Sequence, residues 1–252
     1  MAAKQGKAVA PVDHTEENRF RRFAASPGAR ARLVCLPHAG GSATFYFPVA
    51  KALAPDVEVL AVEYPGRQDR RHEPFLTSID ALRAPDGRPL ALFGHSMGAM
   101  VPTRPRGGRS GTAYRSRDCS SPGAARRRGC GTRACTPGPD EGVLAELRRL
   151  SGTETGLLGD DDVVRMILPA ARNDYRAVET YRHVPGKPLA TPIVAFTGTE
   201  DPMATLDEVA DWAGHTAGGF ELVPLDGGHF FLTRHQDAIL RRLAADLGIV
   251  RV

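Results

Sequence analysis

The sequence feature that most constrains this chain is a Gly-x-Ser-x-Gly pattern, Gly94-His95-Ser96-Met97-Gly98, which directly follows the apolar run of residues 90–93. The run predicts a buried strand, and the pattern is typical of a sharp turn that joins a strand to a helix. Glycine is needed on both sides of the serine because this turn packs backbone against backbone and leaves no room for a Cβ atom. We expect the turn to hold the Ser96 hydroxyl beyond the end of the strand, near the N–H groups that begin the helix.

Strand and helix patterns alternate along most of the chain, which predicts an α/β fold with a doubly wound, mostly parallel sheet. The predicted strands cover residues 31–36, 57–62, 90–93, 192–197 and 220–225, with a possible edge strand at 19–23. The predicted helices cover residues 42–53, 76–82, 143–150, 160–171 with Pro169 as a kink, 206–215 and 236–247. We expect residues 1–18 to be a disordered lead-in and residues 19–252 to form one domain.

Length and composition exclude several classes of protein. No apolar run among the 252 residues approaches the roughly 20 that a membrane span requires, and the first residues lack the apolar core of a signal peptide. The four cysteines show neither metal-ligand nor disulfide spacing. We therefore expect a cytoplasmic protein that binds no metal and does not associate with a membrane.

A serine hydroxyl becomes a useful nucleophile only when a base takes its proton and an acid orients that base. In folds with this turn the partners follow in the order serine, acid, histidine. Asp201 comes directly after a predicted strand, and His229 lies in Gly227-Gly228-His229-Phe230-Phe231 after the last strand. We predict that Ser96, Asp201 and His229 act together. Weaker candidates for the acid or the base are Glu200, Asp226, His38, His183, His215 and His235.

Backbone N–H groups would stabilise the oxyanion that forms when such a serine attacks a carbonyl group. One donor is predicted to be Met97, the residue after the serine. The second is expected from the loop after the first core strand, where Ala39 is our choice and Gly40 the alternative.

Together these residues resemble the type II thioesterases, separate α/β-hydrolases that accompany modular polyketide and non-ribosomal peptide synthases. The resemblance rests on six motifs in the same order: Leu36-Pro37-His38-Ala39-Gly40-Gly41, Tyr64-Pro65-Gly66-Arg67, the serine turn, the region of Leu150-Ser151-Gly152-Thr153, Gly198 to Pro202, and the histidine loop. It implies a serine thioesterase that removes acyl groups from the phosphopantetheine arms of carrier domains and so frees stalled or mis-primed synthases. The alternatives are another α/β-hydrolase esterase or a chain-releasing thioesterase.

The resemblance also implies a helical lid at about residues 141–185 over an acyl channel. Leu144, Leu147, Ile167 and Leu168 would line this channel. It implies acyl or peptidyl carrier domains as partners and no resident cofactor, because the phosphopantetheine belongs to the partner.

The segment from Pro102 to Pro139 departs from this pattern. It contains nine arginines, one acidic residue and no Leu, Ile, Val, Met or Phe, whereas the remaining chain carries a small negative charge. An internal strand of a parallel sheet needs a nearly continuous apolar run. We therefore expect this segment to be irregular, and the sheet to lack an internal strand and most of the helix after Ser96.

Two explanations of the segment compete. One is an arginine-rich insertion that binds nucleic acid or an acidic partner, which would make the chain a nucleic-acid-binding protein. The other is translation in the wrong reading frame, which yields this composition from GC-rich codons and an inactive or poorly soluble product. We favour the frame error because the expected helix and strand are replaced rather than interrupted, and we expect no nucleic-acid binding.

Sequencing the encoding DNA tests this interpretation. We expect two compensating single-base shifts, near residues 100–103 and 139–141, whose correction restores a helix and an apolar strand. An unchanged DNA sequence, together with thioesterase activity and a cooperative melting transition of the chain as written, would contradict it.

Overall fold

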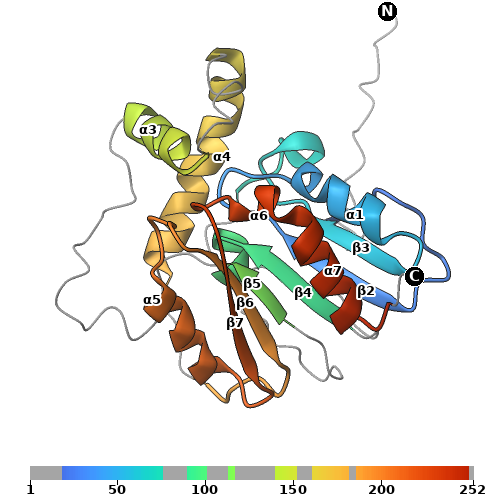
Figure 1. The fold of residues 1–252 in the computed structure, drawn as a ribbon. Coiled ribbons are helices and arrows are strands. Elements are labelled where there is room, and N and C mark those ends of the chain that lie inside the picture. Colours follow the sequence, from blue (N-terminus) through green and yellow to red (C-terminus); the bar gives the residue numbers. More distant parts are fainter. Residues whose placement is uncertain are drawn as a thin grey trace, which may run out of the picture.

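A seven-stranded sheet runs through the part of the chain that this computed structural model describes, residues 19–75, 90–100, 113–116, 140–151, 161–181 and 186–249 (Figure 1). The strand order is β1-β3-β2-β4-β5-β6-β7. β1 pairs antiparallel with β3, and the other neighbours pair in parallel. The strands are β1 (Phe20–Arg21), β2 (Ala31–Leu36), β3 (Val57–Val62), β4 (Leu90–His95), β5 (Ala113–Ser116), β6 (Ile193–Gly198) and β7 (Phe220–Leu225).

Helices cover both faces of the sheet, as the doubly wound prediction requires. On one face α1 (Phe47–Leu53), α6 (Phe231–Arg234) and α7 (Gln236–Asp246) pack on a cluster that includes Cys35, Phe93 and Val194. On the other face α2 (Met97–Met100) packs on Val34 and Leu36, and α5 (Leu206–Ala210) packs on Ala195. The two faces alternate along each strand because successive side chains point to opposite sides.

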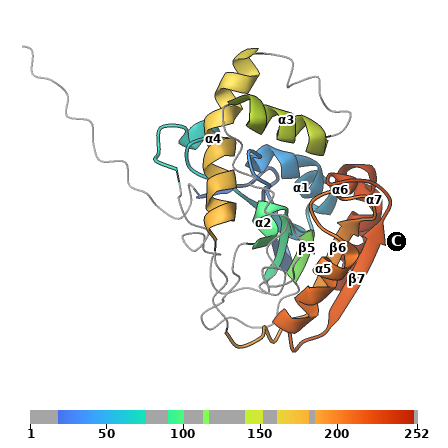
Figure 2. The ribbon, with the colours of Figure 1, turned by 90° about the vertical axis from the view of Figure 1, so that its left-hand side faces the viewer.

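Two further helices, α3 (Asp140–Ser151) and α4 (Asp161–Thr180), lie beside this core (Figure 2). They pack on each other through a cluster that includes Val143, Leu168 and Tyr175. Val178, near the end of α4, packs on the cluster of Met97 and Met100. This contact joins α4 to the helix that follows Ser96. Residues 152–160 and 182–185 lie outside the described residues, so the expected lid boundaries stay a prediction.

The expectation of a missing internal strand is wrong. β5, with the sequence Ala-Tyr-Arg-Ser, lies between β4 and β6 and pairs in parallel with both. Backbone N–H and C=O groups form these ladders whatever the side chains are, and an empty position would leave two interior strands unpaired. The remainder of the segment from Pro102 to Pro139 lies outside the described residues, as does the helix predicted at residues 76–82.

The strand order places the ends of β2 and β4 at a topological switch point. β2 leads to β3 on one side, whereas β4 leads to β5 on the other. Binding sites in open α/β sheets form at this point, beyond the carboxyl ends of the strands. The Ser96 turn and the loop after Leu36 therefore meet where such a site is expected. Within the described ranges, no helix is long and apolar enough to cross a membrane.

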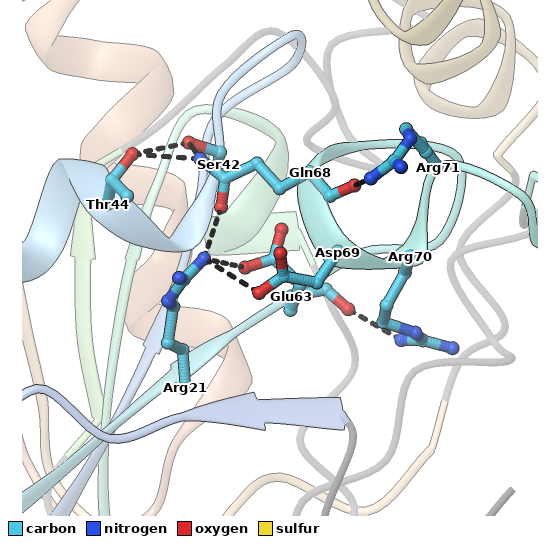
Figure 3. Close-up of polar contacts among 8 residues, drawn as sticks. All are labelled: Arg21, Ser42, Thr44, Glu63, Gln68, Asp69, Arg70 and Arg71. Atoms are coloured by element: carbon cyan, nitrogen blue, oxygen red, sulfur yellow. Dashed lines mark hydrogen bonds and ion pairs between the residues drawn. The ribbon is translucent and has the colours of Figure 1, made fainter.

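Glu63 follows β3 and is a buried acid close to this edge (Figure 3). Neither of its carboxylate oxygens has a hydrogen-bond partner among the described residues, and Arg21 Nη1 lies 3.7 Å away. Burial raises the pKa of Glu63 more than the charge of Arg21 lowers it, and Asp69 raises it further. The folded protein therefore holds the Glu63 proton more tightly than the unfolded chain does.

This sign predicts how Glu63 affects stability. The contribution of Glu63 is most favourable below its ordinary pKa and is lost as the pH rises through the higher pKa of the folded state. Relative to the unmodified protein, Glu63→Gln should become more stable between pH 4 and pH 7 in urea unfolding. Glu221→Gln is the control with the opposite sign, because its hydrogen bonds with Arg242 lower the pKa of Glu221. If the free energies of unfolding of Glu63→Gln and of the unmodified protein change in parallel with pH, the prediction is wrong.

Candidate active site

Ser96 stands between β4 and α2 in a backbone conformation that is rare for its residue type. Its φ angle is +53°, in the left-handed region, and it is almost completely buried. Such a conformation costs about 1–3 kcal/mol and persists only where the surrounding structure imposes it. The Ala99 N–H donates to Ser96 O at 2.9 Å, which begins the helix immediately after the turn. The geometry is that of the predicted strand–turn–helix.

The two flanking glycines explain what imposes this turn. A Cβ atom on Gly94 would lie 2.3 Å from Gly98 O, and one on Gly98 would lie 2.0 Å from Leu36 O. Both contacts are with backbone atoms, which cannot move aside as a side chain would. The two glycines of the turn are in backbone contact with each other, and Gly98 is in backbone contact with the end of β2. Ser96 and the loop after Leu36 are therefore fixed relative to each other.

Asp201 and His229 form a buried pair. His229 Nδ1 lies 3.0 Å from Asp201 Oδ2 and 3.1 Å from Oδ1, and the two side chains are 1% and 2% exposed. Because an ionised carboxylate only accepts hydrogen bonds, Nδ1 carries the proton and the lone pair of the ring lies on Nε2. Asp201 Oδ1 also accepts from Met203 N at 2.9 Å, which fixes the carboxylate. The arrangement leaves Nε2 able to take a proton.

The loops that carry these two residues pack closely because β6 and β7 are neighbours in the sheet. A Cβ atom on Gly198 would lie 2.4 Å from both Gly227 O and Gly228 O. Glu200 N donates to Gly227 O at 3.0 Å, which ties the two loops together. This backbone contact brings Asp201 to His229.

The other candidates for acid and base occupy different places. Glu200 is exposed, and the Asp226 backbone oxygen accepts from His235 Nε2 at 2.8 Å. His215 stacks near Trp212. His183 lies outside the described residues. The geometry of the described residues pairs His229 Nδ1 with Asp201, as predicted, and with no other of these acids.

Two further histidines lie near His229: His95, which no sequence pattern singled out, and His38, which the sequence offered only as a weaker candidate for the base. The ring of His95 lies 4.9 Å from that of His229, and His38 packs edge-on against Phe45 and Phe230. Burial, followed by the charges of His229 and Arg67, lowers the pKa of His38 to about 3. Burial and the other two imidazoles also lower the pKa of His95. Both rings are therefore neutral at neutral pH and add no positive charge beside His229.

Hydrogen bonding in the loop after β2 distinguishes Ala39 from Gly40 as the second oxyanion donor. Gly40 N donates to Asp174 Oδ2 at 2.9 Å, so its hydrogen is already engaged. Ala39 and Met97 are both buried at the edge of the sheet beside Ser96. The arrangement favours Ala39 and Met97 over Gly40 as the oxyanion donors.

The four residues predicted to line an acyl channel lie on α3 and α4. Leu144 and Leu147 pack with buried Leu168 in the cluster between these helices, and Ile167 is half-buried. A Cβ atom on Gly40 would lie 3.2 Å from Ala171 Cβ and 4.0 Å from Leu147 Cδ2. The two helices therefore lie directly over the loop that carries Ala39. Their role in substrate binding stays a prediction.

The sequence analysis missed two residues at this site, Arg67 and Asp174, which form a buried ion pair behind the loop after β2. Arg67 belongs to a motif that the sequence analysis noted without assigning a role, and no pattern singled out Asp174 in α4. Among the described residues, no group of three or more His, Cys, Asp or Glu side chains is arranged to hold a metal ion.

Comparison with known proteins agrees with this geometry. The family model of the thioesterase domain matches residues 31–103 and 118–247. The chain is 42% identical to the thioesterase PikA5 of Streptomyces venezuelae, over 92% of this chain and 86% of that protein. It is 36% identical to the phenyloxazoline synthase MbtB of Mycobacterium tuberculosis, over 95% of this chain but only 18% of that protein.

Solved structures give the same result. The type II thioesterase BorB from the borrelidin biosynthetic cluster superposes with a TM-score of 0.79 at 48% identity, covering 90% of this chain and 97% of that one. The thioesterase RedJ from the prodiginine pathway of Streptomyces coelicolor superposes with a TM-score of 0.74 at 29% identity, covering 88% and 92%. The chain therefore belongs to the thioesterase domain family and is a type II thioesterase with an α/β-hydrolase fold.

Proposed function

We propose that this thioesterase uses Ser96 to hydrolyse acyl groups from the phosphopantetheine arms of acyl or peptidyl carrier domains, and that it thereby frees stalled or mis-primed polyketide or peptide synthases. The observation that carries the mechanism is the buried His229–Asp201 pair, which leaves Nε2 as a base. The similarity to PikA5 and BorB supports the class of substrate. No resident cofactor is needed, because the pantetheine thiol arrives on the partner.

We infer the following reaction for these groups. Ser96 Oγ attacks the thioester carbonyl carbon while His229 Nε2 accepts its proton, and Asp201 stabilises the imidazolium. The oxyanion accepts hydrogen bonds from the N–H groups of Met97 and Ala39. Collapse of this intermediate breaks the C–S bond, and His229 returns the proton to the departing thiolate. Water, deprotonated by His229, then attacks the acyl-serine, and His229 returns this proton to Ser96 Oγ as the free acid leaves.

Substitution of Ser96 and Asp201 tests the mechanism. Ser96→Ala should lower kcat for a short acyl thioester of N-acetylcysteamine by about 10⁴-fold or more, because it removes the nucleophile. Asp201→Asn should lower it by about 10²- to 10⁴-fold, because the amide favours the wrong tautomer of His229. Thiol release is measured on protein that melts cooperatively. Asp226→Asn, a nearby acid outside the pair, is the matched control and should keep its rate. A Ser96→Ala rate near that of the unmodified enzyme would exclude this mechanism.

A comparison of three acyl donors tests which class of substrate the enzyme prefers. The same acyl group is offered on a carrier domain, on N-acetylcysteamine and as a simple oxygen ester, and kcat/KM is measured for each. We expect the carrier-bound thioester to be the best substrate and the free acid to be its product. Equal use of the oxygen ester would indicate a general esterase. A cyclised product would indicate chain release.

A further inference from the structure

Arg67 and Asp174 form a bidentate ion pair that joins α4 to the loop after β3. Arg67 lies in the loop after β3, and Asp174 lies within α4. Arg67 Nη1 donates to Asp174 Oδ2 at 2.8 Å and Nη2 donates to Oδ1 at 2.8 Å, and both side chains are less than a tenth exposed. A paired geometry of this kind fixes direction as well as distance. It therefore determines where α4 lies relative to the loop after β3.

The same two side chains also hold the loop that carries Ala39. Asp174 Oδ2 accepts from Gly40 N at 2.9 Å, and Arg67 Nη1 donates to Gly41 O at 2.7 Å. The Gly40 N–H belongs to the peptide group that directly follows Ala39, so this bond orients the backbone at Ala39. Gly40 has a φ angle of +73°, a conformation that the loop must maintain.

Gln68 holds the next part of the loop from its outer side (Figure 3). Its Nε2 donates to Ser42 Oγ at 2.8 Å and to Thr44 Oγ1 at 3.1 Å, and its Oε1 accepts from Arg21 Nη1 at 3.1 Å. Gln68 has a φ angle of +46°, which a side chain rarely adopts without compensating contacts. Arg67 therefore holds the loop at Gly41, and its neighbour Gln68 holds it at Ser42 and Thr44.

The charges explain why an ion pair suits this position. A lone carboxylate bonded to Gly40 N–H would lie close to the developing oxyanion and would destabilise it. Arg67 neutralises that carboxylate through both oxygens. Loss of Arg67 leaves an unpaired negative charge near the oxyanion, whereas conversion of Asp174 to Asn leaves the positive charge of Arg67, which does not repel an oxyanion, and keeps an acceptor for Gly40 N–H.

We propose that Arg67 and Asp174 are positioning residues for the thioesterase reaction: they align the oxyanion donor of Ala39 and do so only while α4 is docked, so that the position of the lid and stabilisation of the transition state are coupled. This inference rests on the Ser96 mechanism of the proposed function. Its consequence is that docking of α4, one of the two helices predicted to line the acyl channel, affects the rate of the chemical step.

The test compares this pair with a second, partly buried pair at the other end of the same strands, in which Glu58 is also paired with Arg22. Arg32 donates to Glu58 Oε2 at 3.0 and 2.7 Å at the opposite end of β2 and β3, and these side chains are 9% and 13% exposed. The variants are Arg67→Met, Asp174→Asn, the double variant, and the control Arg32→Met. For each we would measure the melting temperature, kcat and KM for a carrier-bound thioester, and inhibition by a trifluoromethyl ketone, which forms a tetrahedral oxyanion with serine.

We expect Arg67→Met to lower kcat by about 10- to 100-fold with little change in KM, because misplacement of a catalytic donor affects the transition state above all. Affinity for the trifluoromethyl ketone should fall by a similar factor. The double variant should recover part of this loss, since it removes the unpaired charge. Arg32→Met should lower the melting temperature and leave kcat within about twofold.

Two results would overturn the inference: an unchanged kcat in folded Arg67→Met, or an equal loss of kcat in Arg32→Met. If Arg67→Met does not fold, the same comparison is made with Asp174→Asn, for which a smaller loss of kcat is expected and an unchanged kcat and inhibitor affinity would overturn the inference. Ser96→Ala distinguishes a failure of the proposed mechanism from a failure of this inference alone. An active Ser96→Ala would refute the proposed mechanism, whereas an inactive Ser96→Ala beside a fully active Arg67→Met would refute only this inference.

Discussion

The close approach of Gly98 to the end of β2 is the constraint on which the site depends. A Cβ atom there would meet Leu36 O at 2.0 Å, so the serine turn and the loop after β2 are in backbone contact. This contact fixes the start of α2, and with it the Met97 N–H, against the loop that carries Ala39. The strained φ of Ser96 follows from the same closure, because the chain must turn within one residue. Main-chain packing therefore positions Ser96 and the two N–H groups, of Met97 and Ala39, to which we assign the oxyanion.

Sequence patterns were sufficient for the parts of the site that local chemistry determines. The glycines around Ser96 and the position of Asp201 after a strand have physical causes that act over a few residues. The pairing of Asp201 with His229 followed from the parallel arrangement of β6 and β7, which the strand–helix alternation indicates. The predicted helix at residues 42–53 also agrees with the structure, as a short 3₁₀ turn at residues 43–46 followed by α1.

The remaining features depend on contacts between distant parts of the chain. Arg67 and Asp174 are 107 positions apart, and no periodicity links a loop after β3 to the middle of α4. His38 was only a weaker candidate for the base and no pattern singled out His95, because the packing of the two rings against each other joins separate loops of the chain. β5 was missed because Ala-Tyr-Arg-Ser lacks the apolar pattern of an interior strand, although its neighbours require a partner. The family match is interrupted between residues 103 and 118, around this same strand.

The position of Asp174 on α4 limits how this helix can vary. Ile167, Ala171 and Asp174 are spaced by four and three residues, so they lie on one face of the helix. A single residue inserted between Ala171 and Asp174 would rotate the carboxylate by about 100° away from Arg67. Ala171 is fully buried against Gly40 and must stay small, whereas half-buried Ile167 can change in size without altering that angle. The helix therefore tolerates substitution at positions such as Ile167 better than insertion or deletion, because only a change in length turns Asp174 away from the loop that carries Ala39.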